Sequence, residues 1–178
     1  MLEAIVWGVI QGITEFLPIS SDGHLVLVPA FLKIEPPDLA TSALLHLGTL
    51  LAVIAYFRQD LVALGRSRSN PNARRLLILL VIGSVPAAAA LLVVDLVSDL
   101  QQSVSATASF LIITGLVMAL VGRLPRGRRT IDDMQPADAL LIGVAQLLAV
   151  LPGISRSGFT IATGLGQRID KLEAARFS

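Results

Sequence analysis

Most of the residues that could do chemistry in this chain lie in one short stretch, QGITEFLPISSDGHL, from Gln11 to Leu25. Within ten residues it places carboxylate, hydroxyl and imidazole groups at Glu15, Ser20, Ser21, Asp22 and His24. These are the group types of a nucleophile and of the acid or base that moves its proton. In hydrocarbon each ionisable group costs about 2.5 kcal/mol or more, so in a chain this apolar they must face protein or a water-filled cavity. The stretch therefore indicates a functional site.

A second stretch, GVAQLLAVLPGISRSG, repeats the first at an offset of 135 residues without a gap. The matched positions are Gly8, Val9, Gln11, Ile19, Ser20 and Gly23 with Gly143, Val144, Gln146, Ile154, Ser155 and Gly158. The second copy has Arg156 between Ser155 and Ser157. One copy thus supplies acid, base and hydroxyl groups, and the other supplies a fixed cation with hydroxyl donors. Chance similarity between two turns rich in glycine and serine is the alternative interpretation.

The composition places this site in a membrane. Of 178 residues, 54% are hydrophobic and 15% are charged, and the mean hydropathy is +0.76. In soluble domains about a quarter of the residues are charged, so this composition excludes a soluble structural role. Cysteine is absent, which excludes disulfides and thiolate metal sites.

Three segments are apolar and long enough to cross a bilayer, at about 41–57, 76–97 and 104–124. Pro86 predicts a kink in the second crossing, where neighbouring helices can satisfy the freed carbonyl. His46 lies inside the first crossing and is interpreted as a packed histidine at a helix interface.

The loops between the crossings differ in charge. Loop 58–75 has five arginines against one aspartate, and loop 125–137 is also basic, whereas 98–103 has no basic residue. The two basic loops lie two crossings apart and so fall on the same side, which the positive-inside rule makes cytoplasmic. We expect loop 98–103 to be external.

The apolar arms around the two polar stretches are too short to cross, because a full crossing needs about 20 residues. We predict re-entrant helix hairpins at 2–34 and about 138–168, although an interfacial hairpin also fits the first. Three crossings separate the copies, and an odd number inverts the second relative to the first. The predicted fold is an all-α integral membrane protein, a single membrane domain over residues 1–178, with two re-entrant hairpins in an inverted-topology repeat whose turns meet near the midplane.

QGITEFLPISSDGHL and PGISRSGFT together resemble the two signature motifs of the undecaprenyl-diphosphate phosphatase family, also called bacitracin-resistance proteins. The first fits an (E/Q)xxxE motif at Gln11 and Glu15, followed by the serine-rich turn and the histidine. The second fits PGxSRSxxT from Pro152 to Thr160. The resemblance covers the whole chain and implies a missing C-terminal part. The pattern of the final KLEAARFS itself predicts the opening of a further amphipathic helix, so the chain is expected to be either a fragment or a shortened version of a larger protein. Asp22 stands where relatives commonly have threonine, and its role stays open.

The resemblance implies an enzyme of the plasma membrane that hydrolyses a polyprenyl (undecaprenyl) diphosphate to the monophosphate and recycles the carrier for cell-wall polysaccharide synthesis. The expected partners are this lipid and the membrane, with no nucleic acid, and a homo-oligomer is left open. The alternative is a transporter or flippase for an anionic lipid head group, since inverted repeats with half-helices also bind transported substrates. A transporter needs only a phosphate clamp, that is, groups such as Arg156 that bind the phosphate, whereas an enzyme also needs a nucleophile and a proton acceptor.

The residues can be given roles on this basis. Arg156 offers bidentate donors to phosphate oxygens, and we expect further substrate contacts from the groups around it. Ser21 is the candidate nucleophile, with His24 as its base or as the acid for the leaving group. Glu15 orients His24 or holds a divalent cation, Mg²⁺ or Ca²⁺. The substrate-binding candidates are Gln11, Ser20, Gly153, Ser155, Ser157 and Thr160.

Overall fold

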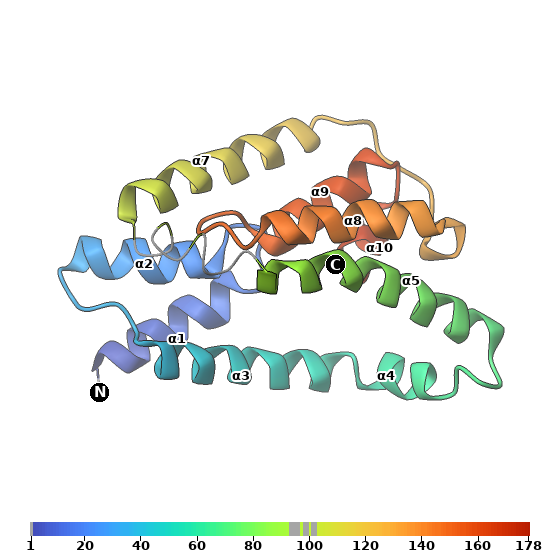
Figure 1. Cartoon of the computed structure of the whole chain (residues 1–178), viewed down its shortest axis with the longest axis horizontal. Coiled ribbons are helices and arrows are strands. Elements are labelled where there is room, and N and C mark those ends of the chain that lie inside the picture. Colours follow the sequence, from blue (N-terminus) through green and yellow to red (C-terminus); the bar gives the residue numbers. More distant parts are fainter. Residues whose placement is uncertain (1, 93–96, 98–99, 101–102) are drawn as a thin grey trace.

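The computed structural model describes residues 2–92, 97, 100 and 103–178, and within this part the regular structure is helical apart from one isolated bridge between Arg129 and Ile169. Figure 1 shows the elements. In chain order they are α1 (Leu2–Thr14), α2 (Ser21–Leu32), α3 (Leu39–Tyr56), α4 (Arg58–Gly65), α5 (Pro71–Ala88), the 3₁₀ turn η1 (Ala89–Leu92), α7 (Val104–Val121), the 3₁₀ turn η3 (Ile131–Asp133), α8 (Pro136–Leu148), α9 (Arg156–Gly166) and α10 (Lys171–Phe177).

Three helical segments are long and apolar enough to cross a membrane, and each coincides with a predicted crossing. They are Leu39–Tyr56, Pro71–Leu92 and Val104–Val121. The second begins five residues earlier than the expected residue 76, because the Asn70 side chain accepts hydrogen bonds from the amides of Asn72 and Ala73. After Pro86, α5 continues to Ala88 and tightens into η1. Residues 93–96 of the predicted crossing lie outside the described residues.

The loop predictions need a correction. The segment 58–75 was expected to be a loop but contains α4 and the first turn of α5. Its charges suggested an irregular segment, yet Asp60 lies in the first turn of α4, where a carboxylate is favourable to the helix dipole. Segment 125–137 contains η3 and the start of α8. Most of the expected external loop, residues 98–99 and 101–102, lies outside the described residues.

The two hairpins have matching local structure. Ser20 caps α2 by accepting a hydrogen bond from the amide of Gly23 at 3.3 Å, and Ser155 caps α9 through the amide of Gly158 at 3.0 Å. These pairs are related by the same offset of 135 that relates the sequences. With these caps, helix begins inside each of the two serine-rich turns, at residues 21 and 156.

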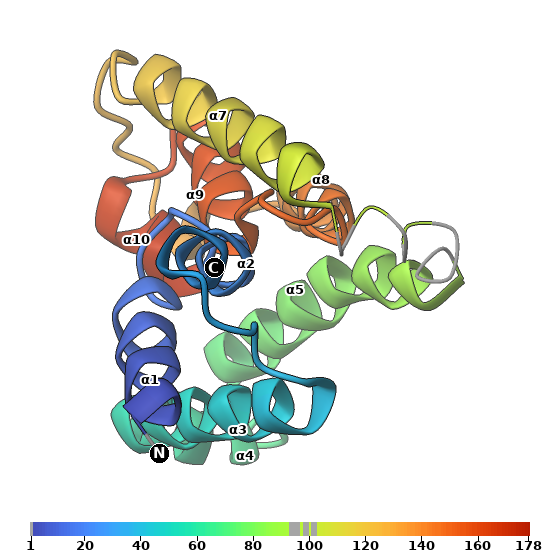
Figure 2. The same ribbon diagram turned by 90° about the vertical axis from the view of Figure 1, so that its left-hand side faces the viewer.

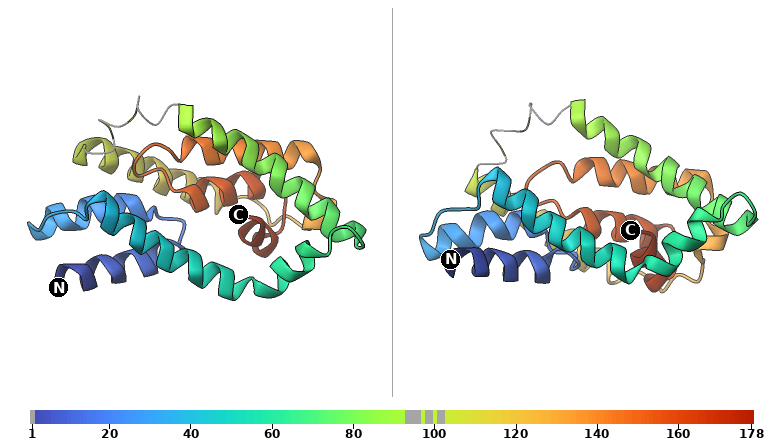
Figure 3. Two further views of the ribbon diagram at one scale, coloured as in Figure 1. Left: turned by 60° about the horizontal axis from the view of Figure 1, so that its bottom comes forward. Right: turned by 90° about the horizontal axis from the view of Figure 1, so that it is seen from below.

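The hairpins run in opposite directions, and their connecting turns lie near the middle of the structure (Figures 1 and 3). In Figure 2, α2 lies between α7 on one side and α1 and α3 on the other. The turns also touch, since the hydroxyl of Ser157 donates to the carbonyl of Leu17 at 3.1 Å. The arrangement brings the two polar stretches of the sequence together.

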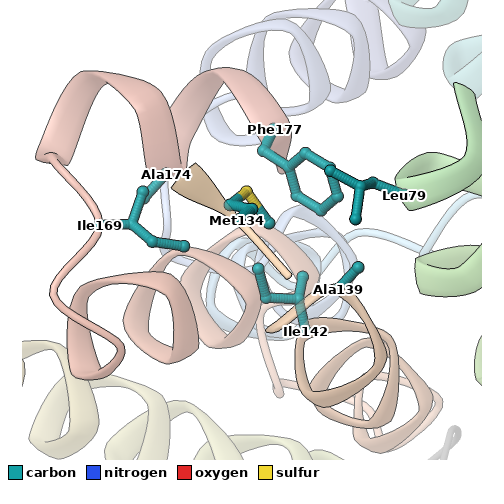
Figure 4. Packing of buried hydrophobic residues seen from close by; sticks show 7 residues of the cluster. All are labelled: Leu79, Met134, Ala139, Ile142, Ile169, Ala174 and Phe177. Carbon is teal, nitrogen blue, oxygen red and sulfur yellow. The ribbon is translucent and has the colours of Figure 1, made fainter. Parts of the chain in front are cut away.

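A hydrophobic cluster packs helix α8 of the second hairpin against α5 and α10 (Figure 4). Helices α5 and α8 cross so closely that a β-carbon at Gly143 would lie 2.3 Å from the carbonyl oxygen of Gly83. Glycine is therefore required at this crossing, as is common between membrane helices. The cluster consists of Leu79, Met134, Ala139, Ile142, Ile169, Ala174 and Phe177. The last of these places α10, the expected C-terminal helix, in the packed core.

Candidate active site

The Glu15 carboxylate, just after α1, joins groups from both hairpins. Its Oε2 accepts hydrogen bonds from the Ser21 hydroxyl at 2.5 Å and from the Gln11 amide nitrogen at 3.1 Å. Its Oε1 accepts from the Arg156 guanidinium at 2.9 Å. One carboxylate thus holds the hydroxyl of one hairpin and the cation of the other.

The groups around Glu15 differ in exposure, and this difference has chemical consequences. The Glu15 side chain is 13% exposed, whereas that of Arg156 is 63% exposed. Ser21 is buried, and the buried Oε1 of Gln11 has no hydrogen-bond partner among the described residues. An exposed guanidinium keeps donors free for a further anion.

His24 lies in the first turn of α2 but is directed at the backbone. Its Nδ1 is 2.7 Å from the carbonyl oxygen of Ser20, and since a carbonyl only accepts, Nδ1 carries the hydrogen. The Ser21 hydroxyl donates to Glu15 and not to His24. Nε2 of His24 is the nitrogen left for a substrate. Ser20 itself has a φ of 67°, in the left-handed region that favours glycine.

Helix α7 fixes the turn before Arg156. The hydroxyl of Thr114 donates to the carbonyl of Gly153 at 2.9 Å and accepts from the amide of Ser155 at 3.2 Å. Gly153 has a φ of 91°, and a β-carbon there would lie 2.4 Å from the carbonyl oxygen of Thr107. Only glycine fits this position, which explains the glycine of the second motif in physical terms.

The hydroxyls of the second motif are already engaged in the fold. Those of Ser155 and Ser157 lie 3.2 Å apart. Thr160 is buried, donates to the carbonyl of Arg156 at 2.8 Å and lies 2.5 Å from the hydroxyl of Ser178. Thr160 therefore ties α9 to the end of the chain, while the two serines stay beside Arg156.

Two residues next to this cluster, Thr114 and His46, were not predicted from the sequence to take part in it. Thr114 holds the Gly153 turn, and no motif marked it. Asp22 contacts His46, which was interpreted as a packing residue, through an Oδ1 to Nε2 distance of 3.4 Å. The sequence offered a signal for this contact, because Asp22 and His46 are two ionisable residues in an apolar sequence and His46 lies inside a crossing.

Away from the hairpin turns, charged groups fix the basic end of the fold. Arg129 forms an ion pair with Asp138 at the start of α8. Burial raises the pKa of Asp138, but the hydrogen bonds from Arg129 and from the amide of Gln135, with the Arg129 charge, outweigh it and lower that pKa overall. A cavity of about 440 Å³ also lies at this end, lined by Arg68, Arg74 and Met134 among others, and it contains none of the predicted site residues.

Fold and site together define a polytopic membrane protein with an internal cluster of hydroxyl, carboxylate and guanidinium groups suited to a phosphate-bearing substrate. The sequence pattern of the Bacitracin resistance protein BacA family matches residues 4–178. The chain belongs to this family.

Its relatives carry a consistent name. An undecaprenyl-diphosphatase from Moorella thermoacetica is 40% identical over 184 residues, covering 100% of this chain and 70% of that protein. Another from Desulfosudis oleivorans is 42% identical over 99% of this chain and 71% of its own length. Undecaprenyl-diphosphatase 3 of Bacillus cereus is 38% identical, over 99% of this chain and 67% of that protein.

Proposed function

We propose that this chain hydrolyses undecaprenyl diphosphate to undecaprenyl monophosphate and inorganic phosphate. The observation that carries the proposal is the Glu15 carboxylate, which bonds the Ser21 hydroxyl and the Arg156 guanidinium at the same time. Family membership and the names of the relatives support the same reaction. It would return the lipid carrier to the synthesis of cell-wall polysaccharide.

The first step in this proposal is attack by the Ser21 oxygen on the terminal phosphorus. The bond from Ser21 Oγ to phosphorus forms, the bond to the bridging oxygen breaks, and the polyprenyl monophosphate leaves. Glu15 accepts the hydroxyl proton, because its Oε2 already accepts the hydrogen bond from Ser21. Water then cleaves the phosphoserine, which restores the Ser21 hydroxyl and releases phosphate.

Arg156 and the turn around it bind the phosphates. Its Nη2 bonds Glu15, and the exposed guanidinium has further N–H donors for phosphate oxygens. The Ser20 hydroxyl, which accepts from the Gly23 amide at the start of α2, can still donate to a phosphate oxygen. The hydroxyls of Ser155 and Ser157, at the start of α9, donate within the fold and would have to turn toward a phosphate to bind it. Gly153 lets the turn pack against α7. Phosphoryl transfer depends mainly on such positioning and charge neutralisation.

His24 and the attacking group leave a mechanistic choice. With Nδ1 donating to the Ser20 carbonyl, Nε2 of His24 can protonate the leaving oxygen when the ring is an imidazolium, which carries a hydrogen on both nitrogens. In the competing mechanism, water activated by Glu15 attacks directly and Ser21 only donates a hydrogen bond to the phosphate. A covalent phosphoserine would form in the first mechanism alone.

A divalent cation, Mg²⁺ or Ca²⁺, fits this site if the substrate completes its coordination. The described residues contain no group of three or more His, Asp or Glu side chains arranged for a metal. The Glu15 carboxylate and the unpartnered Oε1 of Gln11 are two oxygen ligands, and Mg²⁺ is commonly held by one or two carboxylates plus substrate phosphates. The cation would neutralise phosphate charge.

We further propose that the opposed hairpins are re-entrant segments of an inverted repeat. Their helices α1, α2, α8 and α9 span 11 to 13 residues each, too few to cross a bilayer. Their caps correspond at one constant offset, and their turns meet at Glu15 and Arg156. The basic segments 58–75 and 125–137 are separated by two crossings, so both would lie on one side, which the positive-inside rule makes cytoplasmic.

The experiment is phosphate release from a long-chain polyprenyl diphosphate by the purified chain in detergent, with and without chelator. We expect release that Arg156→Ala abolishes. Lipid translocation between the leaflets of a vesicle, without phosphate release, would support the transporter instead.

A further inference from the structure

Two ionisable side chains beside the Glu15 cluster meet within the apolar part of the fold. Nε2 of His46, midway along the crossing helix α3, lies 3.4 Å from Oδ1 of Asp22. Asp22 is the second residue of α2 and directly follows Ser21. Ionisable groups in a membrane segment pair with one another because hydrocarbon does not solvate them.

The hydrogen bond on the other side of the ring determines what this contact requires. Nδ1 of His46 is 2.8 Å from the carbonyl oxygen of Ser42, so Nδ1 carries a hydrogen. In a neutral ring Nε2 would then be an acceptor and would repel the Asp22 oxygen. The contact is attractive only when a proton lies between Nε2 and Oδ1.

We propose that His46 is a positioning residue, which holds the first turn of α2 through Asp22 and so keeps the Ser21 hydroxyl on Glu15. The inference rests on the proposed phosphatase reaction. The hydrogen bond of His46 to the Ser42 carbonyl and its contact with Asp22 link the backbone of α3 to α2, immediately before the residue that donates to Glu15. Raising the pH removes the shared proton, so the turn loosens and turnover falls on the alkaline side.

Other titratable groups lie near α3, and the experiment has to separate them. The titratable residues on α3 and on the elements packed against it are Glu3, Glu15, Asp22, His24, Asp38, Tyr56, Arg58 and Asp60. Of these, Asp22 and Glu15 act electrostatically on the His46 ring. A variant that keeps the donor and removes only its titration isolates the contribution of His46.

His46→Gln is that variant, because its amide N–H donates to Asp22 at every pH. We expect its kcat to stay close to that of the parent and to lack the alkaline fall attributed to His46. His46→Leu, which has no donor, should lower kcat by about 10-fold to 100-fold with KM unchanged, since the Arg156 clamp is intact. Ser84→Ala on α5 is the control, because among the described residues this exposed hydroxyl bonds only its own helix, at Leu80.

A second measurement tests the pair without activity. The chain has two histidines, so ¹⁵N-histidine labelling gives two imidazoles, and His46→Gln assigns them by elimination. We expect Asp22→Asn to shift the titration of the His46 ring. Unchanged titration of His46 would overturn the pairing, and a His46→Leu kcat equal to that of the parent would overturn the positioning role. Absence of phosphate release by the parent would instead refute the proposed function.

Discussion

The identity of the proton acceptor can be tested at Glu15. Glu15→Gln preserves size and can still accept a hydrogen bond from Ser21, but it cannot take up the proton. In the structure the Ser21 oxygen is 2.5 Å from Glu15, so loss of this acceptor should remove the full contribution of a positioned base, about 10² to 10⁴ in kcat. His24→Ala acts on the leaving group in this scheme and should cost a separate factor of the same order.

The matched control is Asp60→Asn, which also converts a carboxylate to an amide and breaks an ion pair with an arginine, Arg176. That pair lies away from the hairpin turns, so activity should remain that of the parent. The assay is phosphate release from polyprenyl diphosphate at saturating substrate, with all variants in one detergent. Glu15→Gln at parental kcat would refute Glu15 as the base.

The nucleophile is decided in the same series. Ser21→Ala should abolish turnover while the chain still binds the diphosphate through Arg156, and rapid quench of the parent should trap a phosphoserine. A Ser21→Ala chain within tenfold of the parent would leave Ser21 as a hydrogen-bond donor and favour direct attack by water.

Three further outcomes are expected. Arg156→Lys should lose most activity although the charge is kept, because an ammonium cannot replace two parallel N–H donors; near-normal turnover would make the arginine a structural cation. Single cysteines in segments 58–75 and 125–137 of this cysteine-free chain should resist impermeant labelling from outside, and labelling would contradict the topology. Because folding lowers the pKa of Asp138, its ionised carboxylate stabilises the fold above the pKa of the unfolded chain, about 3.9. This stabilisation is lost as the pH falls through the pKa of the folded chain. The Tm difference between the parent and Asp138→Asn should therefore be full at pH 7 and shrink below about pH 4; a constant difference would refute the assignment.

Hydropathy was sufficient to find the crossings, because a bilayer imposes a minimum apolar length that ordinary loops lack. Local capping was harder to anticipate. The sequence predicted turns around Ser20 and Ser155, but each serine accepts an amide hydrogen bond from the glycine three residues later and so starts a helix. Reading the two serines as caps would have placed Ser21 and Arg156 in first helical turns.

Some contacts around Glu15 follow from spacing along the sequence, whereas others depend on tertiary packing. Gln11 and Glu15 are one helical turn apart, and their contact follows from that spacing. The partner of His24 did not follow, because the Ser20 carbonyl competes for Nδ1 within the same turn. The contact between Asp22 and His46 depends on how α2 sits against α3, which no local pattern encodes.

The proposed repeat explains why one carboxylate can hold both a hydroxyl and a cation. Ser21 and Arg156 are the first helical residues after equivalent serine caps, and they are separated by the offset of 135 that relates the two copies. In two opposed hairpins whose turns meet, equivalent positions approach each other, and here both side chains bond the carboxylate of Glu15. The position equivalent to Glu15 is Val150, so the carboxylate exists once. In the proposed mechanism, the differences at these two pairs of equivalent positions would place the attacking group and its acceptor in one copy and the phosphate-binding cation in the other, whereas two identical copies would place like groups against each other.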